Sequence, residues 1–336
     1  MTNALAPRPR RAFPEIASVS WEHEADRAAL QALRSVPGFE DVVRKILAAL
    51  GGERGIRLLF QGNAVRVGPD QFPRIWGLHV EVCTTFDWPK IPELFVSQTP
   101  FFNAGAYGVD DPFIVLNSTT LEMLNEEELR ALIAHEMGHV VSGHAFYRTI
   151  AAILAMVSLG ALPFLAGLAL LPVRLAFLEW SRKAELSADR AGLLGCQNVI
   201  AAMSLHMKAA GGGREVGFND QMNVDAFMIQ AHQYNDTNDG LAVVYKIINT
   251  LGLTHPMNTV RAAELQHWVA NGDYDRILRG EYVHRGTESR ERPIKNDMAD
   301  AGNYYAREAR ETAGKMAQAA KDAAGRVGDA FRKGRQ

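Results

Sequence analysis

The segment from residue 134 to residue 139 reads Ala-His-Glu-Met-Gly-His and contains an uninterrupted HExxH motif. On an α-helix, residues four apart lie on the same face, so His135 and His139 can present two imidazole nitrogens to one metal ion. Glu136 then stands beside the remaining metal position, where its carboxylate can take a proton from a bound water. The motif therefore demands a helix at this point of the chain and predicts a zinc site with a general base.

The residues before the motif carry the signals of a helix start. Asn125 is a favourable N-cap, and Glu128, three residues later, can complete a capping box. Apolar residues then recur at helical spacing, at Leu129, Leu132, Ile133, Met137 and Val140. We therefore expect the two histidines to project from a mostly buried helix. The alternative is that they are ordinary core histidines with satisfied hydrogen bonds.

A catalytic zinc needs a third protein ligand and an open fourth position. The extended pattern HExxHxxGxxH does not apply, because Ser142 replaces its glycine, Ala145 replaces its third histidine, and His144 is out of register. Downstream, Glu185 and Asp189 lie four residues apart, so they share one face of a second helix. On that helix Glu185 can bind the metal while Asp189 accepts the N–H of a ligand histidine.

Taken alone, a glutamate and an aspartate at this spacing are more often solvated residues of an amphipathic helix. Here their neighbours are small or apolar, which favours close helix packing: Leu186, Ala188, Ala191, Gly192 and Leu193. Two histidines and a carboxylate around an open position favour zinc over other divalent metals. We expect one Zn²⁺ per chain.

These motifs together resemble the M48 family of zinc metallopeptidases, the group that includes the Ste24-type and HtpX-type proteases. The matching residues are His135–His139, Glu185–Asp189, Thr254–Pro256 with Arg261, and Asn103–Ala106. The resemblance runs from about residue 55 to about residue 285. HExxH alone is shared by many unrelated peptidases, so the combination of motifs is what makes the resemblance specific.

The resemblance implies a role for each matched residue. It makes His135, His139 and Glu185 the zinc ligands and Glu136 the catalytic base. It places His255 and Arg261 where the family is thought to stabilise the oxyanion of the tetrahedral intermediate. It also implies that Asn103, Ala104, Gly105 and Ala106 belong to an edge strand that holds the peptide substrate.

Sequence pattern supports a strand pair in this region. Residues 101–107 and 113–116 are expected to be strands, separated by a turn at Gly108–Pro112. If residues 103–106 form an exposed sheet edge, their unpaired backbone groups can bind an extended peptide as an additional strand. The pattern alone, without the resemblance, favours an ordinary hairpin with a polar edge.

The predicted fold class is α+β and mainly α: a zincin-like domain with a small sheet and an edge strand, the HExxH helix and a helical lobe. Other expected strands are 56–60, 64–67 and 94–97. Other expected helices are 21–35, 39–50, 71–86, one ending near Gly195, one ending at the glycines 211–213, 219–233, 241–251 and 257–269. His206 has no partner at ligand spacing and receives no role.

We predict three regions: a helical extension (1–54), the metallopeptidase domain (55–285) and a charged, alanine-rich tail (286–336) that is flexible or marginally helical. Within the domain no residue is charged from Thr149 to Val173. A single membrane crossing is excluded, because His139 and Glu185 must reach the same ion from opposite ends of this run. Two crossings would need about 40 apolar residues. The run therefore predicts an apolar hairpin at 149–178.

Arg148 and Arg174 put positive charge at both ends of the hairpin, which suits two ends on the cytoplasmic side of a membrane. The first 20 residues lack the apolar run of a secretory signal, so we expect a cytoplasmic start. We therefore favour membrane contact through 149–178. The alternative is a soluble enzyme whose hairpin packs on its own core or on a partner.

Composition limits the remaining choices. A formal net charge of −2 gives no general attraction to nucleic acid, and the two cysteines do not imply a disulfide framework. The predicted function is a zinc metalloendopeptidase acting on polypeptides, with Glu136 as general base, in protein quality control at the membrane. The alternative is a non-catalytic, zinc-stabilised protein that binds unfolded or membrane client proteins. The sequence predicts no oligomeric state.

Overall fold

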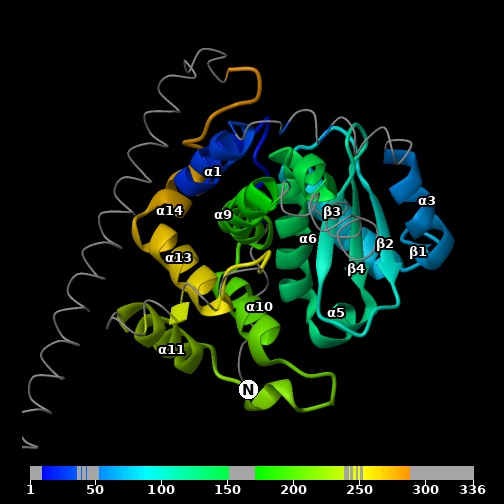
Figure 1. Cartoon of the computed structure of the whole chain (residues 1–336). Coiled ribbons are helices and arrows are strands. Elements are labelled where there is room, and N and C mark those ends of the chain that lie inside the picture. Colours follow the sequence, from blue (N-terminus) through cyan, green and yellow to red (C-terminus); the bar gives the residue numbers. More distant parts are fainter. Residues whose placement is uncertain are drawn as a thin grey trace, which may run out of the picture.

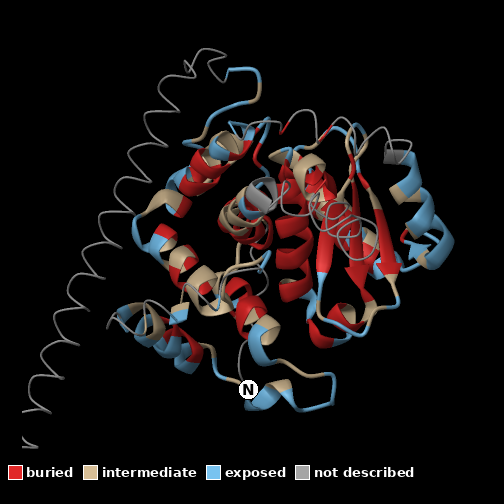
Figure 2. Ribbon diagram, viewed as in Figure 1, coloured by how far each residue is buried: buried red, intermediate tan, exposed pale blue. Residues whose placement is uncertain are grey.

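The computed structural model describes residues 10–35, 39, 43, 53–150, 171–237, 242, 245, 246, 249 and 253–287. This part of the chain is mainly helical and contains a small mixed sheet, so the α+β prediction is confirmed. In Figure 1 the sheet lies beside helix α6 (Glu126–Val141), and helix α9 (Leu171–Cys196) packs against α6 on the side away from the sheet. Figure 2 shows that α6 and the strands beside it are buried almost throughout.

The sheet has four strands in the order β1-β2-β4-β3. They are β1 (Ala64–Arg66), β2 (Glu93–Ser97), β3 (Ala104–Tyr107) and β4 (Phe113–Asn117). β2 and β4 are parallel neighbours, whereas β1 and β3 pair antiparallel at the two edges. β4 is therefore covered on both sides and buried along its whole length. β3 is an edge strand of the described sheet and contacts α6.

Helix α6 starts where the sequence predicts. Asn125 Oδ1 accepts the Glu128 N–H at 3.0 Å, and Glu128 Oε2 accepts the Asn125 N–H at 2.9 Å, which completes the capping box. Every residue from 128 to 140 is buried, so the helix runs through the core. The HExxH motif consequently lies inside the molecule on a helix whose start is fixed by its own side chains.

Helices α6 and α9 approach each other closely because small residues line their interface. A Cβ atom on Gly195 would lie 2.2 Å from Ala134 Cβ, and one on Gly138 would lie 2.5 Å from Ala191 Cβ. Neither distance leaves room for a side chain. The small residues around Glu185 therefore do what the sequence predicts, and they bring the Glu185 backbone up to the HExxH helix.

The remaining helices surround this pair. Their bounds are α1 (Glu24–Arg34), α3 (Glu53–Asn63), α4 (Pro73–Thr85), α5 (Ser118–Met123), α10 (Val199–Gly211), α11 (Val224–Asp236), α13 (Asn258–Ala270) and α14 (Asp273–Leu278), with short 3₁₀ turns at Ser18–Ser20 and Asn219–Gln221. α1 packs on α9, α4 packs on α6, and α10 and α13 contact both each other and α9. These elements confirm the predicted helices at 21–35, 71–86 and 257–269.

The predicted strand at 56–60 is wrong, because these residues form part of helix α3. Ile56 and Phe60, four residues apart, pack on the cluster around Phe95 and Phe113. Leu58 and Leu59 between them are 54% and 51% exposed. A strand would have buried alternate residues, including Leu58, whereas the observed burial follows the helical repeat.

Several predicted segments lie largely or wholly outside the described residues: the helices at 39–50 and 241–251, the hairpin at 149–178 before α9 begins, and the tail at 286–336. Within the described ranges, no helix is both long enough and apolar enough to span a bilayer.

Candidate metal centre

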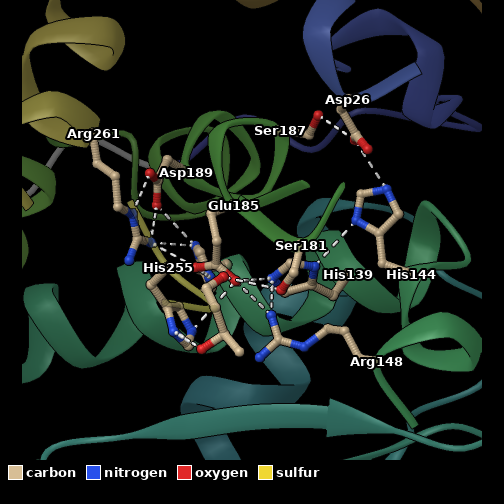
Figure 3. A network of polar contacts seen from close by, with 12 residues as sticks. Asp26, His139, His144, Arg148, Ser181, Glu185, Ser187, Asp189, His255 and Arg261 are labelled. Atoms are coloured by element: carbon tan, nitrogen blue, oxygen red, sulfur yellow. Dashed lines mark hydrogen bonds and ion pairs between the residues drawn. The ribbon is translucent and has the colours of Figure 1, made fainter. Parts of the chain in front are cut away.

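Two helices bring three metal-binding side chains together. His135 and His139 lie one turn apart on α6, and Glu185 faces them from α9. One ligand atom from each residue lies within 4.8 Å of the other two. The three residues are 4%, 0% and 1% exposed. Figure 3 shows Glu185 and His139 converging within one polar network.

The distances are compatible with a shared ion. His135 Nε2 lies 3.4 Å from Glu185 Oε2, and His139 Nε2 lies 3.3 Å from Glu185 Oε1. Among the residues that the structure describes, neither Glu185 Oε2 nor Glu136 Oε2 receives a hydrogen bond, although both atoms are buried. Glu185 Oε2 has the Arg261 guanidinium at 3.2 Å, whereas a buried oxygen without a partner, such as Glu136 Oε2, is costly unless a cation or a water satisfies it. The donor set of two imidazoles and a carboxylate therefore fits a divalent metal such as zinc.

Asp189 holds the ring of His135 from the side away from Glu185. Asp189 Oδ1 lies 3.0 Å from His135 Nδ1. Arg261 donates to both oxygens of the same carboxylate, at 2.8 Å and 2.5 Å. Burial alone would raise the pKa of Asp189, but Arg261 holds this pKa well below its usual range. The ionised Asp189 thus accepts the Nδ1–H of His135 and leaves Nε2 directed at the proposed ion.

The buried ionisable groups of the site shift one another's pKa values. Burial disfavours the charged form of His135, yet its hydrogen bonds to Asp189 and Glu185 raise its pKa to about 9. Burial would also raise the pKa of Glu185, but its neighbours His255, Arg261 and Arg148 hold this pKa well below the ordinary value. Without an ion, His135 thus holds a proton beside the ionised Glu185, and a divalent metal would have to displace that proton to bind.

Arg148 also reaches this centre. Its Nη1 atom lies 2.6 Å from Glu185 Oε1 and 2.6 Å from His139 Nε2. Sequence reasoning placed Arg148 only at the end of the apolar run and gave it no part in the site. Thirty-seven residues separate it from Glu185, so no local pattern could reveal the pairing.

A cleft of about 170 Å³ opens at the centre. Its lining includes the start of β3 and the residue before it, the HExxH helix, Glu185 of α9, and the two positions implied for oxyanion binding. These residues are Asn103, Ala104, His135, Glu136, Glu185, His255 and Arg261. Glu136 is buried in this lining, and burial raises its pKa. The structure thus brings Glu136 and β3 to one cavity with the three candidate ligands.

The predicted substrate-binding stretch is only partly free to bind. The Asn103 N–H donates to Thr120 Oγ1 at 2.9 Å, and its carbonyl accepts the Asn117 N–H at 3.1 Å. Ala104, Gly105 and Ala106 belong to β3 and pair with β4 on one side only. Within the described residues β4 is thus the one strand paired with residues 104–106, which are buried, and Asn103 lines the cleft just before them.

His255 and Arg261 occupy different positions in the cleft. His255 Nε2 lies 3.5 Å from Glu185 Oε1, and its Nδ1 is 2.8 Å from Thr254 Oγ1. Arg261 Nη2 lies 3.2 Å from Glu185 Oε2, besides its two bonds to Asp189. His255 is the more exposed of the two, with 39% of its side chain accessible.

His206, which received no role from the sequence, also lines the cleft. It is buried on α10, and its Nε2 lies 3.7 Å from Asp189 Oδ1. Burial lowers the pKa of His206 to about 4, so the ring is neutral at pH 7. Only the packing of α10 beside α9 brings it there, and no spacing rule within one helix could have indicated it.

Comparisons with known proteins agree with this geometry. The model of peptidase family M48 matches residues 69–269. The plastoglobule-localized metallopeptidase 48 of Arabidopsis thaliana chloroplasts is 32% identical over 272 residues, which is 80% of this chain and 77% of the relative. A protease HtpX homolog of Caldanaerobacter subterraneus is 36% identical over 95 residues, which is 28% of this chain and 31% of the relative. No solved structure matches the chain.

Proposed function

Because the chain belongs to peptidase family M48 and is by that membership a protease, we propose that it is a zinc-dependent endopeptidase with a zincin-like active site. One Zn²⁺ would be held by His135, His139 and Glu185. The observation that carries this proposal is the convergence of their three ligand atoms within 4.8 Å at a buried point beside Glu136.

The chemistry divides between the ion and the chain. When bound, zinc would act as a Lewis acid that lowers the pKa of a water molecule to about 7 and polarises the substrate carbonyl. Glu136 takes the proton of the attacking water and delivers it to the leaving nitrogen. Its raised pKa suits both steps, because a carboxylate that is too acidic would hold the proton too weakly.

His255 and Arg261 complete the site. Both lie in the cleft within 3.5 Å of a Glu185 oxygen, so either can offer a donor to negative charge that develops on the substrate carbonyl. Asp189 fixes the guanidinium of Arg261 by two hydrogen bonds, which limits its movement during the reaction. His255 is the more accessible of these two donors, since its side chain is partly exposed.

The substrate class follows from the strand beside the cleft. Family membership implies polypeptide substrates. As an edge of the described sheet, β3 could pair at residues 104–106 with an extended peptide and lay it across the centre. An extended backbone is the only form that presents its donors and acceptors to such an edge.

We also propose that the enzyme works in protein quality control at a membrane, on its cytoplasmic side. The support is the uncharged run from 149 to 173 with arginines at both ends, together with the plastoglobule localisation in the name of one relative. After lysis in low salt without detergent, the protein should sediment with membranes. Recovery in the supernatant would contradict this part of the proposal.

The central test is digestion of an unfolded protein by the purified chain and by its Glu136→Gln variant, with zinc content measured in both. Cleavage by the wild type and none by the variant, at equal zinc, is the expected result. If neither protein cleaves although both hold zinc, the non-catalytic client-binding alternative takes precedence. Similar cleavage by both proteins would remove Glu136 as the base.

A further inference from the structure

A line of buried polar side chains leads from His139 away from the cleft. His139 Nδ1 lies 3.1 Å from His144 Nδ1, and His144 Nε2 lies 3.1 Å from Asp26 Oδ2. All three residues are at most 2% exposed. Figure 3 shows the line running from the centre to α1, on which Asp26 lies.

The two ends of this line fix where its protons lie. At the inner end Arg148 Nη1 is 2.6 Å from His139 Nε2, and a guanidinium can only donate, so this nitrogen carries a lone pair. The proton of His139 is then on Nδ1 and is donated to His144 Nδ1. His144 in turn carries its proton on Nε2 and donates it to Asp26. A carboxylate can only accept, so both ends require the same arrangement.

The carboxylate at the outer end is held firmly. Ser187 Oγ donates to Asp26 Oδ2 at 2.6 Å, and Trp180 Nε1 donates to Asp26 Oδ1 at 3.1 Å. Burial would raise the pKa of Asp26, but His144 and the Ser187 hydroxyl lower it below the ordinary value, so the group is ionised. Ser187 and Trp180 both lie on α9, the helix that also carries Glu185.

Asp26 stands to His139 as Asp189 stands to His135, except that one more residue lies between the carboxylate and the ligand histidine. Asp189 Oδ1 contacts the Nδ1 of His135 directly at 3.0 Å, whereas Asp26 acts on His139 through an intervening imidazole. In metal sites, carboxylates that accept from the second nitrogen of a ligand histidine fix its tautomer and ring orientation. Both candidate ligand histidines thus have their Nε2 atom directed at Glu185 by a buried carboxylate on the other side of the ring.

We propose that Asp26 and His144 are positioning residues of the metal centre, which hold the ring of His139 with Nε2 presented to the ion. This inference rests on the proposed ligand set. Asp26 lies outside the residues 69–269 that match the family model, so helix α1 contributes to the metal centre from beyond the matched domain.

A purely structural role for the same groups makes a different prediction. Any buried hydrogen-bonded cluster stabilises the fold, and its loss lowers the unfolding temperature whatever its connection to the metal. A positioning role also changes the metal affinity and the coordination geometry of the protein that remains folded. Zinc affinity and the visible absorption spectrum of bound Co²⁺ report these two properties without any need for catalysis.

The test uses the full-length chain, stripped of metal and titrated with Zn²⁺ against a competing chelator, and separately with Co²⁺. We expect Asp26→Asn and His144→Phe to weaken zinc binding about ten- to hundredfold and to shift the Co²⁺ absorption bands. His79→Phe is the matched control. His79 is also fully buried and is hydrogen-bonded to the Pro92 carbonyl, but it contacts none of the proposed ligands. The His79→Phe variant should unfold at a lower temperature than the wild type and bind zinc with the same affinity.

Zinc affinity and Co²⁺ spectra equal to those of the wild type in both Asp26→Asn and His144→Phe would overturn the inference. Asp26→Asn keeps the shape of the side chain, so it decides the matter alone if His144→Phe does not fold. Glu185→Ala tests the ligand set itself, since it should abolish tight binding. A wild-type chain that binds neither ion would refute the ligand set and the role of Asp26 together, whereas a chain that binds zinc but cleaves nothing would contradict only the proposed function.

Discussion

Arg148 Nη1 lies 2.6 Å from Glu185 Oε1, and the same nitrogen is 2.6 Å from His139 Nε2. The positive charge therefore lies between two proposed zinc ligands, where it opposes the binding of a divalent cation. We expect Arg148→Met to lower the zinc dissociation constant at least about tenfold, which corresponds to about 1.4 kcal/mol. Competition titration measures this change.

Arg130→Met is the control for that experiment. Arg130 is a buried arginine of α6 that pairs with Glu81 and Glu127 rather than with the ligands. Its replacement removes one positive charge from the same helix and should leave zinc affinity unchanged. Unchanged or weaker zinc binding by Arg148→Met would show that Arg148 does not compete with the ion.

Removal of the ion should stop proteolysis and lower stability together. Each proposed zinc ligand is buried, and metal that binds only the folded chain stabilises it by about 4 kcal/mol when its concentration is 1,000 times the dissociation constant. A chelator should therefore abolish cleavage and lower the unfolding temperature, and added Zn²⁺ should restore both. Full activity in a preparation that contains no metal would exclude the zinc mechanism.

His255→Ala should reduce turnover about a hundredfold, the cost of losing one oxyanion donor, while zinc remains bound. The partly exposed ring lies in the cleft and is not needed to hold the ion in the proposed ligand set. Parallel measurements of kcat and zinc content check this, with His267→Ala, an exposed change on α13, as the control. Turnover equal to that of the wild type would remove His255 from the mechanism.

Gly195→Ala should destabilise the fold by about 1–3 kcal/mol, because the added methyl group would overlap Ala134 between α6 and α9. Gly77→Ala is the matched control on helix α4. A Cβ atom there meets nothing within 4 Å, so that change should stabilise the helix by about 0.5–1 kcal/mol. Thermal unfolding of both variants decides whether close packing or helix propensity dominates at Gly195.

The two thiols should be unreactive in the native protein. Cys83 and Cys196 are buried, and burial raises the pKa of each to about 12, so almost no thiolate forms at pH 8. We expect no reaction with a disulfide reagent such as DTNB at pH 8 and two equivalents after denaturation. Rapid labelling of the folded chain would show that one of the two sites opens.

Local patterns were enough to predict the ligand helices. The capping box at Asn125 and the helical repeat that follows it fix α6, and the carboxylates of α9 lie four residues apart on one face. The strand predicted at 56–60 is instead part of helix α3. Its few apolar residues are close together, and the sequence alone does not show which of them are buried.

The parts of the site that the sequence did not reveal all depend on contacts between distant segments. Asp26 and Ser187 are 161 residues apart, and Arg148 and Glu185 are 37 residues apart. His144 failed the spacing rule for a third ligand, yet it contacts a ligand at 3.1 Å. Such pairings are set by how helices pack, and no periodicity within one helix encodes them.

The packing of α6 on α9 has a consequence for how this kind of protein can diversify. Contacts along the two helices hold the three candidate ligand atoms together, so the position of these atoms depends on how α6 packs on α9 rather than on the length of chain that joins the two helices. Loop closure becomes costlier by only about 0.6 kcal/mol for each doubling of loop length. Evolution can therefore exchange this connection for segments of other length and polarity, and so move the same catalyst between different cellular settings without rebuilding its metal site.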